Sequence, residues 1–222
     1  MITGVIVPLA IEARTARPLR RDGWRIVHSG VGARRAREAA LLLLAAGADR
    51  LLVWGTAGGL VPELRPGTLI IPRLVRDEAG AEYPTDNGWR ETIRMRLPPA
   101  MPCVDTALVS VNTPAVDAAD KHALAYRTGA EAVDMETAAV AAVAAELGVP
   151  CATLRAIADP LELALPRCVL DARCDRLLPL EIPLRLVLHP RDMPALRALA
   201  HSFGAARRSL QATARCIAQS SH

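Results

Sequence analysis

Short runs of aliphatic and β-branched residues alternate with helical stretches along the first two thirds of this chain. The runs end next to glycine or Asp-Pro turns, a pattern typical of α/β domains, in which strands and helices follow one another. We expect strands at residues 2–7, 25–28, 51–54, 68–71, 107–111 and 151–157, and helices at 33–46 and 135–147. The 222 residues are near the upper size that one hydrophobic core organises, so the sequence predicts one domain over residues 1–222.

The composition excludes several classes of protein. Hydrophobic residues make up 51% of the chain and charged residues 23%, which disfavours disorder and low complexity. Aromatic residues make up only 3%, too few for the stacking platforms that bind single-stranded nucleic acids. The five cysteines are an odd number and follow no metal-ligand spacing. We therefore expect no nucleic-acid partner, no metal and no disulfide framework, and we expect reduced thiols.

The hydropathy and the start of the sequence predict a cytoplasmic protein. No stretch reaches the roughly 18 apolar residues of a spanning helix, and the first residues lack the basic region and cleavage site of a signal peptide. The net charge is +4, and its excess lies in the C-terminal segment 161–222, where arginines without acids follow Met193. This stretch can form a terminal amphipathic helix with a solvated face. The alternative is peripheral contact with the anionic inner face of a membrane.

Four polar residues follow predicted strands or begin a helix, at the sheet edge where α/β domains bind ligands. They are Glu12, Thr56, Glu136 and Asp159. Thr56 belongs to a predicted glycine turn over residues 55–59, whose backbone N–H groups can approach an anion or a sugar. Asp134 and Glu136 lie at the start of an otherwise almost wholly apolar helix, where buried carboxylates are costly without partners. For each residue alone, a capping or turn role stays open.

Two further segments carry weaker signals. Gly30-Val31-Gly32 precedes a predicted helix, but Arg35 stands where a dinucleotide-binding motif needs its third glycine. Residues 73–103 contain several prolines and glycines among mixed charges. We predict a long irregular excursion there, of the kind that covers a site and governs the choice of substrate.

Together these segments resemble one family, the purine nucleoside phosphorylase and nucleosidase superfamily, over roughly residues 2–160. The segment AVDMETAAVAAVAAELGVPCATLRAIADP is similar to the family's Glu/Asp-Met-Glu helix and the strand end that follows, and SGVG and GTAGGL are similar to its two turns. The resemblance implies a three-layer α/β domain with a central mixed, twisted sheet flanked by helices. It also implies a homo-oligomeric enzyme that cleaves purine nucleosides at the N-glycosidic bond without a cofactor.

The resemblance assigns a role to each candidate residue. Asp159 would protonate or hydrogen-bond N7 of the leaving purine, and Glu12 would activate water as in the nucleosidase branch. Met135 and Glu136 would bind the sugar. These roles suit the reaction, because cleavage builds positive charge on the sugar and negative charge on the purine. The loop that contacts the base is expected within residues 112–120.

The nucleophile is water or phosphate, and Thr56 and Gly58 match family positions near the sugar and the attacking group. Phosphorylases that resemble this chain carry an arginine three residues before that hydroxyl, where this sequence has Val53, and another in the first loop, where it has a carboxylate. Phosphate needs cationic donors, so hydrolysis is favoured. Arg14 and Arg34 lie close enough in sequence to keep phosphorolysis open.

The 5′ substituent of the substrate distinguishes the branches of the family. Asp134, the segment around Lys121 and the Pro- and Arg-rich C-terminal segment look closer to the hopanoid-associated branch, whose members release adenine from adenosylhopane. The alternatives are a methylthioadenosine/adenosylhomocysteine or futalosine-type nucleosidase and a phosphate-dependent purine nucleoside phosphorylase. An alternative from another class, a non-catalytic nucleotide-binding module, is disfavoured because Glu12, Glu136 and Asp159 are all present.

Overall fold

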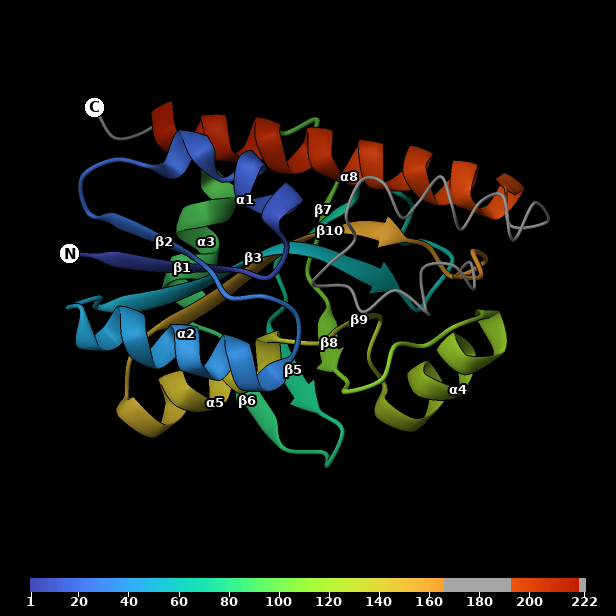
Figure 1. Cartoon of the computed structure of the whole chain (residues 1–222), viewed down its shortest axis with the longest axis horizontal. Helices are drawn as coiled ribbons and strands as arrows, with labels where there is room; N and C mark the ends of the chain where they lie inside the picture. Colours follow the sequence, from blue (N-terminus) through green and yellow to red (C-terminus); the bar gives the residue numbers. More distant parts are fainter. Residues whose placement is uncertain (166–192, 220–222) are drawn as a thin grey trace.

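The computed structural model describes residues 1–165 and 193–219, in which ten strands form one sheet between two layers of helices (Figure 1). The strands are β1 (Thr3–Val7), β2 (Trp24–His28), β3 (Arg50–Gly59), β4 (Leu69–Ile70), β5 (Leu74–Asp77), β6 (Glu82–Pro84), β7 (Cys103–Val104), β8 (Ala107–Ser110), β9 (Ala132–Asp134) and β10 (Cys151–Asp159). The helices are α1 (Ala10–Thr15), the 3-10 turn η1 (Arg17–Leu19), α2 (Ala33–Ala45), α3 (Asn87–Met95), α4 (Ala118–Thr128), α5 (Thr137–Leu147) and α8 (Met193–Gln219). The predicted α/β fold with a mixed central sheet flanked by helices is confirmed.

Strand β3 lies at the centre of the sheet. It pairs in parallel with β10 on one side, while its other side pairs in parallel with β1 up to Val53 and antiparallel with β9 from Gly58. The sheet order is β6-β5-β8-β9-β3-β10-β4-β7, and β2 extends it beyond β1. Between Val53 and Gly58, the edge of β3 is therefore paired with neither β1 nor β9, and Glu12 of α1, the helix after β1, occupies this place.

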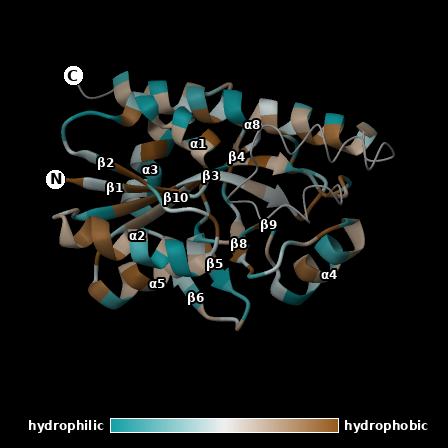
Figure 2. Ribbon diagram, in the orientation of Figure 1, coloured by the Kyte–Doolittle hydropathy of each residue, from teal (hydrophilic) through white to brown (hydrophobic). Residues whose placement is uncertain are grey.

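Alternate residues of the central strands pack into two cores, one on each face of the sheet. Leu51 and Val53 pack against α2 and α5, whereas Leu52 and Trp54 pack against α1, α3 and α8. Figure 2 shows polar and apolar residues side by side on α2 and α8. Such amphipathic helices bury one side against the sheet and leave the other in water.

Helix α8 crosses one face of the sheet and is the predicted terminal amphipathic helix. Its buried positions include Ala206, Leu210 and Ala214, while Arg207 and Arg208 are exposed. The apolar side of the helix thus packs against the domain. No helix among the described residues is long and apolar enough to cross a bilayer. Much of the basic C-terminal segment, with Cys168 and Cys174, lies outside the described residues.

Three local predictions were wrong. The residues predicted as a glycine turn, 55–59, continue β3, because pairing with β10 and β9 keeps these glycines extended. The segment 73–103 is not irregular: it contains β5, β6, α3 and the start of β7. Helix α5 begins at Thr137 rather than at residue 135, because Glu136 has a non-helical backbone conformation at the N-cap.

Candidate active site

A cavity of about 260 Å³ lies where β3, β9 and β10 end, and it brings together every residue predicted for the site. Its lining includes Glu12, Thr56, Gly58, Met135, Glu136 and Asp159. Pro114 and Ala115, from the loop expected to contact the base, line it as well. Among the lining residues that the structure describes, none comes from 73–103. That segment therefore does not cover the cavity, contrary to the prediction.

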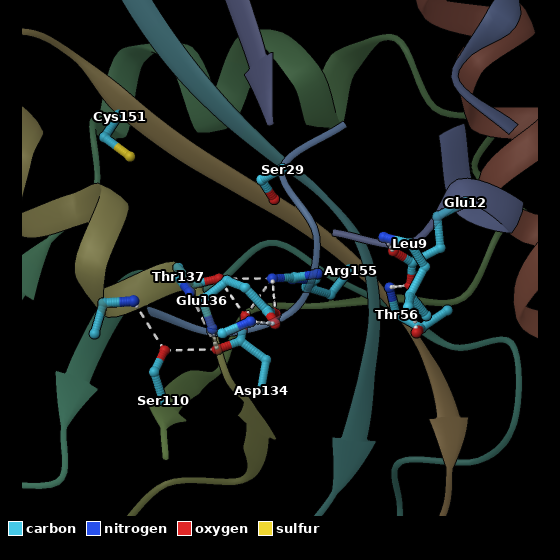
Figure 3. A network of polar contacts seen from close by, with 12 residues as sticks. Leu9, Glu12, Ser29, Thr56, Ser110, Asp134, Glu136, Thr137, Cys151 and Arg155 are labelled. Atoms are coloured by element: carbon cyan, nitrogen blue, oxygen red, sulfur yellow. Dashed lines mark hydrogen bonds and ion pairs between the residues drawn. The ribbon is translucent and has the colours of Figure 1, made fainter. Parts of the chain in front are cut away.

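Glu12 fills the unpaired edge of β3. It sits in α1, directly after β1, and its Oε1 accepts hydrogen bonds from the Thr56 backbone N–H at 2.8 Å and from Thr56 Oγ1 at 2.6 Å. Its Oε2 accepts a hydrogen bond from the Leu9 backbone N–H at 3.1 Å. The carboxylate is 2% exposed, and these three donors fix its direction (Figure 3).

Arg155 is a buried cation that the sequence analysis did not assign to the site. Its Nη2 donates to Asp134 Oδ2 at 2.5 Å and lies 3.3 Å from Glu136 Oε2. Figure 3 shows its side chain between Glu12 on one side and the other two carboxylates on the other. We call Arg155 with Glu12, Asp134 and Glu136 the arginine cluster. It contains three carboxylates and one guanidinium.

Asp134 and Glu136 are held from several elements. Ser110 Oγ of β8 donates to Asp134 Oδ1 at 2.5 Å, and the Thr137 backbone N–H at the start of α5 donates to the same oxygen at 3.2 Å. Glu136 Oε1 accepts from the Gly32 backbone N–H at 2.9 Å. The turn before α2, whose dinucleotide-binding pattern is incomplete, therefore orients a carboxylate of the cavity.

Burial dominates the electrostatics of the arginine cluster. It raises the pKa of Glu136 to about 7, and the nearby guanidinium of Arg155 limits this rise. Burial also raises the pKa of Glu12, against the opposing effects of Arg155 and the hydrogen bonds from Thr56. A carboxyl group whose pKa lies near neutrality can exchange a proton during a reaction.

Asp159 forms a separate ion pair at another part of the cavity. Lys121 Nζ of α4 donates to Asp159 Oδ1 at 2.8 Å, and the lysine side chain is completely buried. Burial raises the pKa of Asp159, while the Lys121 ammonium acts in the opposite direction. We call Lys121 and Asp159 the lysine pair.

Gly55 allows the side chains of Arg155 and Glu12 to approach β3 closely. A Cβ atom at this position would lie 2.6 Å from Arg155 Nη1 and 2.7 Å from Glu12 Oε2. Both distances are shorter than any normal contact with a carbon atom, so no larger residue fits without moving one of the two groups. In the parallel pairing of β3 with β10, Gly55 is the residue paired with Arg155.

The sequence thus predicts the carboxylates of the cavity but not the cations that pair with them. Arg14 and Arg34, the cations predicted for phosphate, do not line the cavity, and Arg34 pairs with Glu38 at the surface. Arg155 could have been suspected because it interrupts an otherwise apolar strand, four residues before Asp159. Within the described part of the chain, no group of three or more His, Cys, Asp or Glu side chains is arranged to hold a metal ion.

Comparison with known proteins assigns the family. A model of the phosphorylase superfamily matches residues 22–166, a range that starts after Glu12. No sequence in a search of curated proteins matches significantly. Solved structures share the fold at low sequence identity. Futalosine hydrolase of Helicobacter pylori is 18% identical with a TM-score of 0.72, and the alignment covers 98% of this chain and 95% of that one.

Two nucleosidase structures are similar in the same way. The 5′-methylthioadenosine/S-adenosylhomocysteine nucleosidase of Neisseria meningitidis, in complex with methylthio-immucillin-A, is 16% identical with a TM-score of 0.74 over 97% of this chain and 98% of that one. The corresponding enzyme of Helicobacter pylori is 17% identical with a TM-score of 0.72 over 98% of this chain and 96% of that one. Because the family model matches more than half of the chain, this protein is an enzyme of the phosphorylase superfamily.

Proposed function

We propose that this enzyme hydrolyses the N-glycosidic bond of a purine nucleoside and releases the free purine. The observation that supports this most strongly is the position of Glu12. It is a buried carboxylate with a raised pKa, and it lies in the same cavity as Asp159. One carboxyl group can therefore serve as general base for water while another acts as general acid toward the base.

In the proposed reaction, Asp159 donates a proton to N7 of the purine as the bond between C1′ and N9 breaks. The bonding electrons stay with the purine, and the sugar becomes an oxocarbenium-like cation. Glu12 takes a proton from a water molecule, whose oxygen bonds to C1′. The arginine cluster stabilises the cation because its carboxylates outnumber its guanidinium, and Met135 and Glu136 bind the sugar. One proton leaves the protein and one enters it, so the net reaction is hydrolysis.

The distribution of charge favours water over phosphate as the nucleophile. Arg155 is the only Lys or Arg among the described residues that line the cavity, and its guanidinium is already paired with Asp134 and Glu136. A phosphate ion would therefore meet a surplus of carboxylates and a single cation that already forms two ion pairs.

For the 5′ substituent, we propose a large apolar group, with adenosylhopane as the specific substrate. The resemblance to the hopanoid-associated branch supports this, as does the apolar wall formed by Leu165, Leu199 and Phe203. Methylthioadenosine, adenosylhomocysteine and futalosine are the competing substrates, because the structures of similar fold include nucleosidases for these compounds.

The test is release of free purine, measured by chromatography, from adenosylhopane, methylthioadenosine, futalosine and adenosine. Each substrate is tested with and without phosphate, using the wild type and Asp159→Asn. We expect phosphate-independent release, fastest from adenosylhopane, and a loss of about 10²–10⁴-fold in kcat in the variant. Release that requires phosphate would overturn the hydrolytic mechanism. Preference for a small 5′ group would overturn the proposed substrate, and undiminished activity of the variant would overturn the role of Asp159.

A further inference from the structure

Lys121 is a buried cation with no role in the reaction as proposed so far. Its side chain is completely buried, and removing an ammonium group from water is costly unless acceptors replace the lost hydration. Nζ donates to Asp159 Oδ1 at 2.8 Å, to the Pro160 backbone oxygen at 2.7 Å and to the Leu163 backbone oxygen at 2.9 Å. An ammonium group has three N–H donors, and here each has an acceptor.

These contacts leave the two oxygens of Asp159 in different environments. Oδ1 is bound to Lys121, whereas no donor contacts Oδ2 within residues 1–165 and 193–219. Oδ2 is directed toward Gly58 of β3, where an added Cβ atom would lie 3.5 Å from it. Gly58 and Asp159 both line the cavity. Within the described residues, Oδ1 of Asp159 is therefore held by a hydrogen bond, whereas Oδ2 lies on the cavity side without a hydrogen-bond donor.

Lys121 also fixes the backbone that carries Asp159. The register between β10 and β3 shifts between Ile157 and Asp159, so the end of β10 is not held by regular pairing alone. The backbone oxygens of Pro160 and Leu163 accept hydrogen bonds from Lys121. These bonds hold the residues after the register shift against α4. The Leu165 backbone N–H, bonded to the Val116 oxygen at 2.8 Å, continues this contact.

We propose that Lys121 is the positioning residue of the leaving-group step: it holds Asp159 with Oδ2 toward the purine and stabilises the carboxylate that forms when the proton moves to N7. This inference rests on the proposed function, in which Asp159 acts on the base. Before the transfer the ammonium faces a neutral carboxyl group, and afterwards it faces a carboxylate 2.8 Å away. The attraction therefore grows as the reaction proceeds, which is the condition for lowering a barrier.

The pH dependence of the reaction reports this role. Lys121 lowers the pKa of Asp159 while burial raises it, so removal of the ammonium should raise this pKa further. The other charged groups that line the cavity are Glu12, Asp134, Glu136 and Arg155. The Lys121 variant keeps all of these groups. In a profile of kcat against pH, the fall at higher pH arises where Asp159 loses its proton. A shift of this part of the profile alone would therefore indicate the loss of the lysine pair.

The experiment compares Lys121→Met with the wild type on two substrates that share one 5′ group. One is the purine nucleoside, and the other is the 4-nitrophenyl riboside, whose leaving group departs without protonation. We expect kcat for the purine substrate to fall about 10²-fold, the effect of a misplaced catalytic group. The limb at higher pH should move to higher pH, and the nitrophenyl substrate should lose less than about threefold in kcat, because its departure needs no acid.

Arg76→Met is the matched control. Arg76 Nη1 donates to the Thr128 backbone oxygen at 2.8 Å and so anchors the other end of α4 without contacting Asp159. Its activity on both substrates should match that of the wild type. Equal losses on both substrates in Lys121→Met, or an unmoved pH profile, would overturn the inference. A wild type without purine release would instead refute the proposed function.

A second measurement covers the case in which Lys121→Met does not fold. In the wild-type protein, the ¹⁵N signal of the Lys121 ammonium should shift as Asp159 titrates, and the shift should be absent in Asp159→Asn. A signal that does not respond to this titration would overturn the inference without any Lys121 variant.

Discussion

The arginine cluster and Asp159 of the lysine pair line the same cavity, but the two groups differ in charge balance. The arginine cluster places three carboxylates around one guanidinium, whereas the lysine pair places one carboxyl group against one ammonium. Under the proposed function, the excess of carboxylates faces the sugar, where positive charge develops, and the balanced pair faces the purine, which receives a proton. One cavity thus provides two electrostatic environments because each end has its own ratio of acids to cations.

The largest expected effect comes from removing the cation of the arginine cluster. Arg155→Met should lower the free energy of unfolding by about 3–5 kcal/mol, because it leaves buried carboxylates without a partner. Urea denaturation followed by circular dichroism measures the loss. Arg37→Met, which breaks the exposed pair with Glu146, should leave the free energy of unfolding almost unchanged, because water screens an exposed ion pair. Similar losses in the two variants would mean that the cluster does not depend on its guanidinium.

Gly55→Ala tests whether the geometry of the arginine cluster is as critical as its charge. The added methyl group would push Arg155 and Glu12 apart, and we expect kcat to fall about 10²-fold. Gly88→Ala is the control, because a Cβ atom there meets only Asp86 Oδ1, at 3.7 Å. Steady-state kinetics on the purine substrate decide the question. Equal activity of the two variants would show that the close approach at Gly55 is unimportant for turnover.

Glu136→Gln tests the electrostatic contrast through binding. A nucleoside analogue with a cationic sugar ring should bind about 10–100-fold more weakly, because a charge-assisted contact is lost. In the wild type its affinity should rise as the pH increases through about 7, the pKa of Glu136, since the carboxyl group then becomes negative. Calorimetry between pH 5.5 and 8.5 should find that this dependence disappears in the variant. Persistence of the full dependence in Glu136→Gln would assign it to another group.

The smallest expected effect concerns the apolar wall, which belongs to neither charged group. Phe203→Ala should lower the ratio of kcat/KM for a nucleoside with a long apolar 5′ group to that for adenosine by about tenfold, a loss typical of an apolar contact. Arg207→Ala, exposed on the same helix, should leave the ratio unchanged. Equal losses for both nucleosides in Phe203→Ala would place Phe203 at the sugar or the base instead.

The sequence predicted the elements whose pattern is local. Each of the apolar runs of β1 and β10, and the glycine that follows α2, is a pattern of only a few neighbouring residues, so the α/β fold could be predicted from them. The residues after Trp54 were predicted as a turn because glycine commonly ends strands. Their extended conformation depends on pairing with β9 and β10, which are distant in the sequence.

The same distinction applies to the site. Glu12, Glu136 and Asp159, which line the cavity, could be predicted because acids beside apolar segments are conspicuous and because their segments resemble those of one family. In the sequence, the segment around Lys121 indicates only a resemblance to one branch of the family. Its contact with Asp159 joins residues separated by 38 positions. Such a contact exists only after α4 has packed beside the end of β10, so no local sequence pattern predicts it.

Helix α8 contributes both to the cavity and to the core. Leu199 and Phe203 line the cavity from its first turns, Phe203 also packs against the core, and Leu210 and Ile217 lie in that core several turns later. Substitutions in the first turns can therefore alter which nucleosides fit while the later turns keep the domain folded.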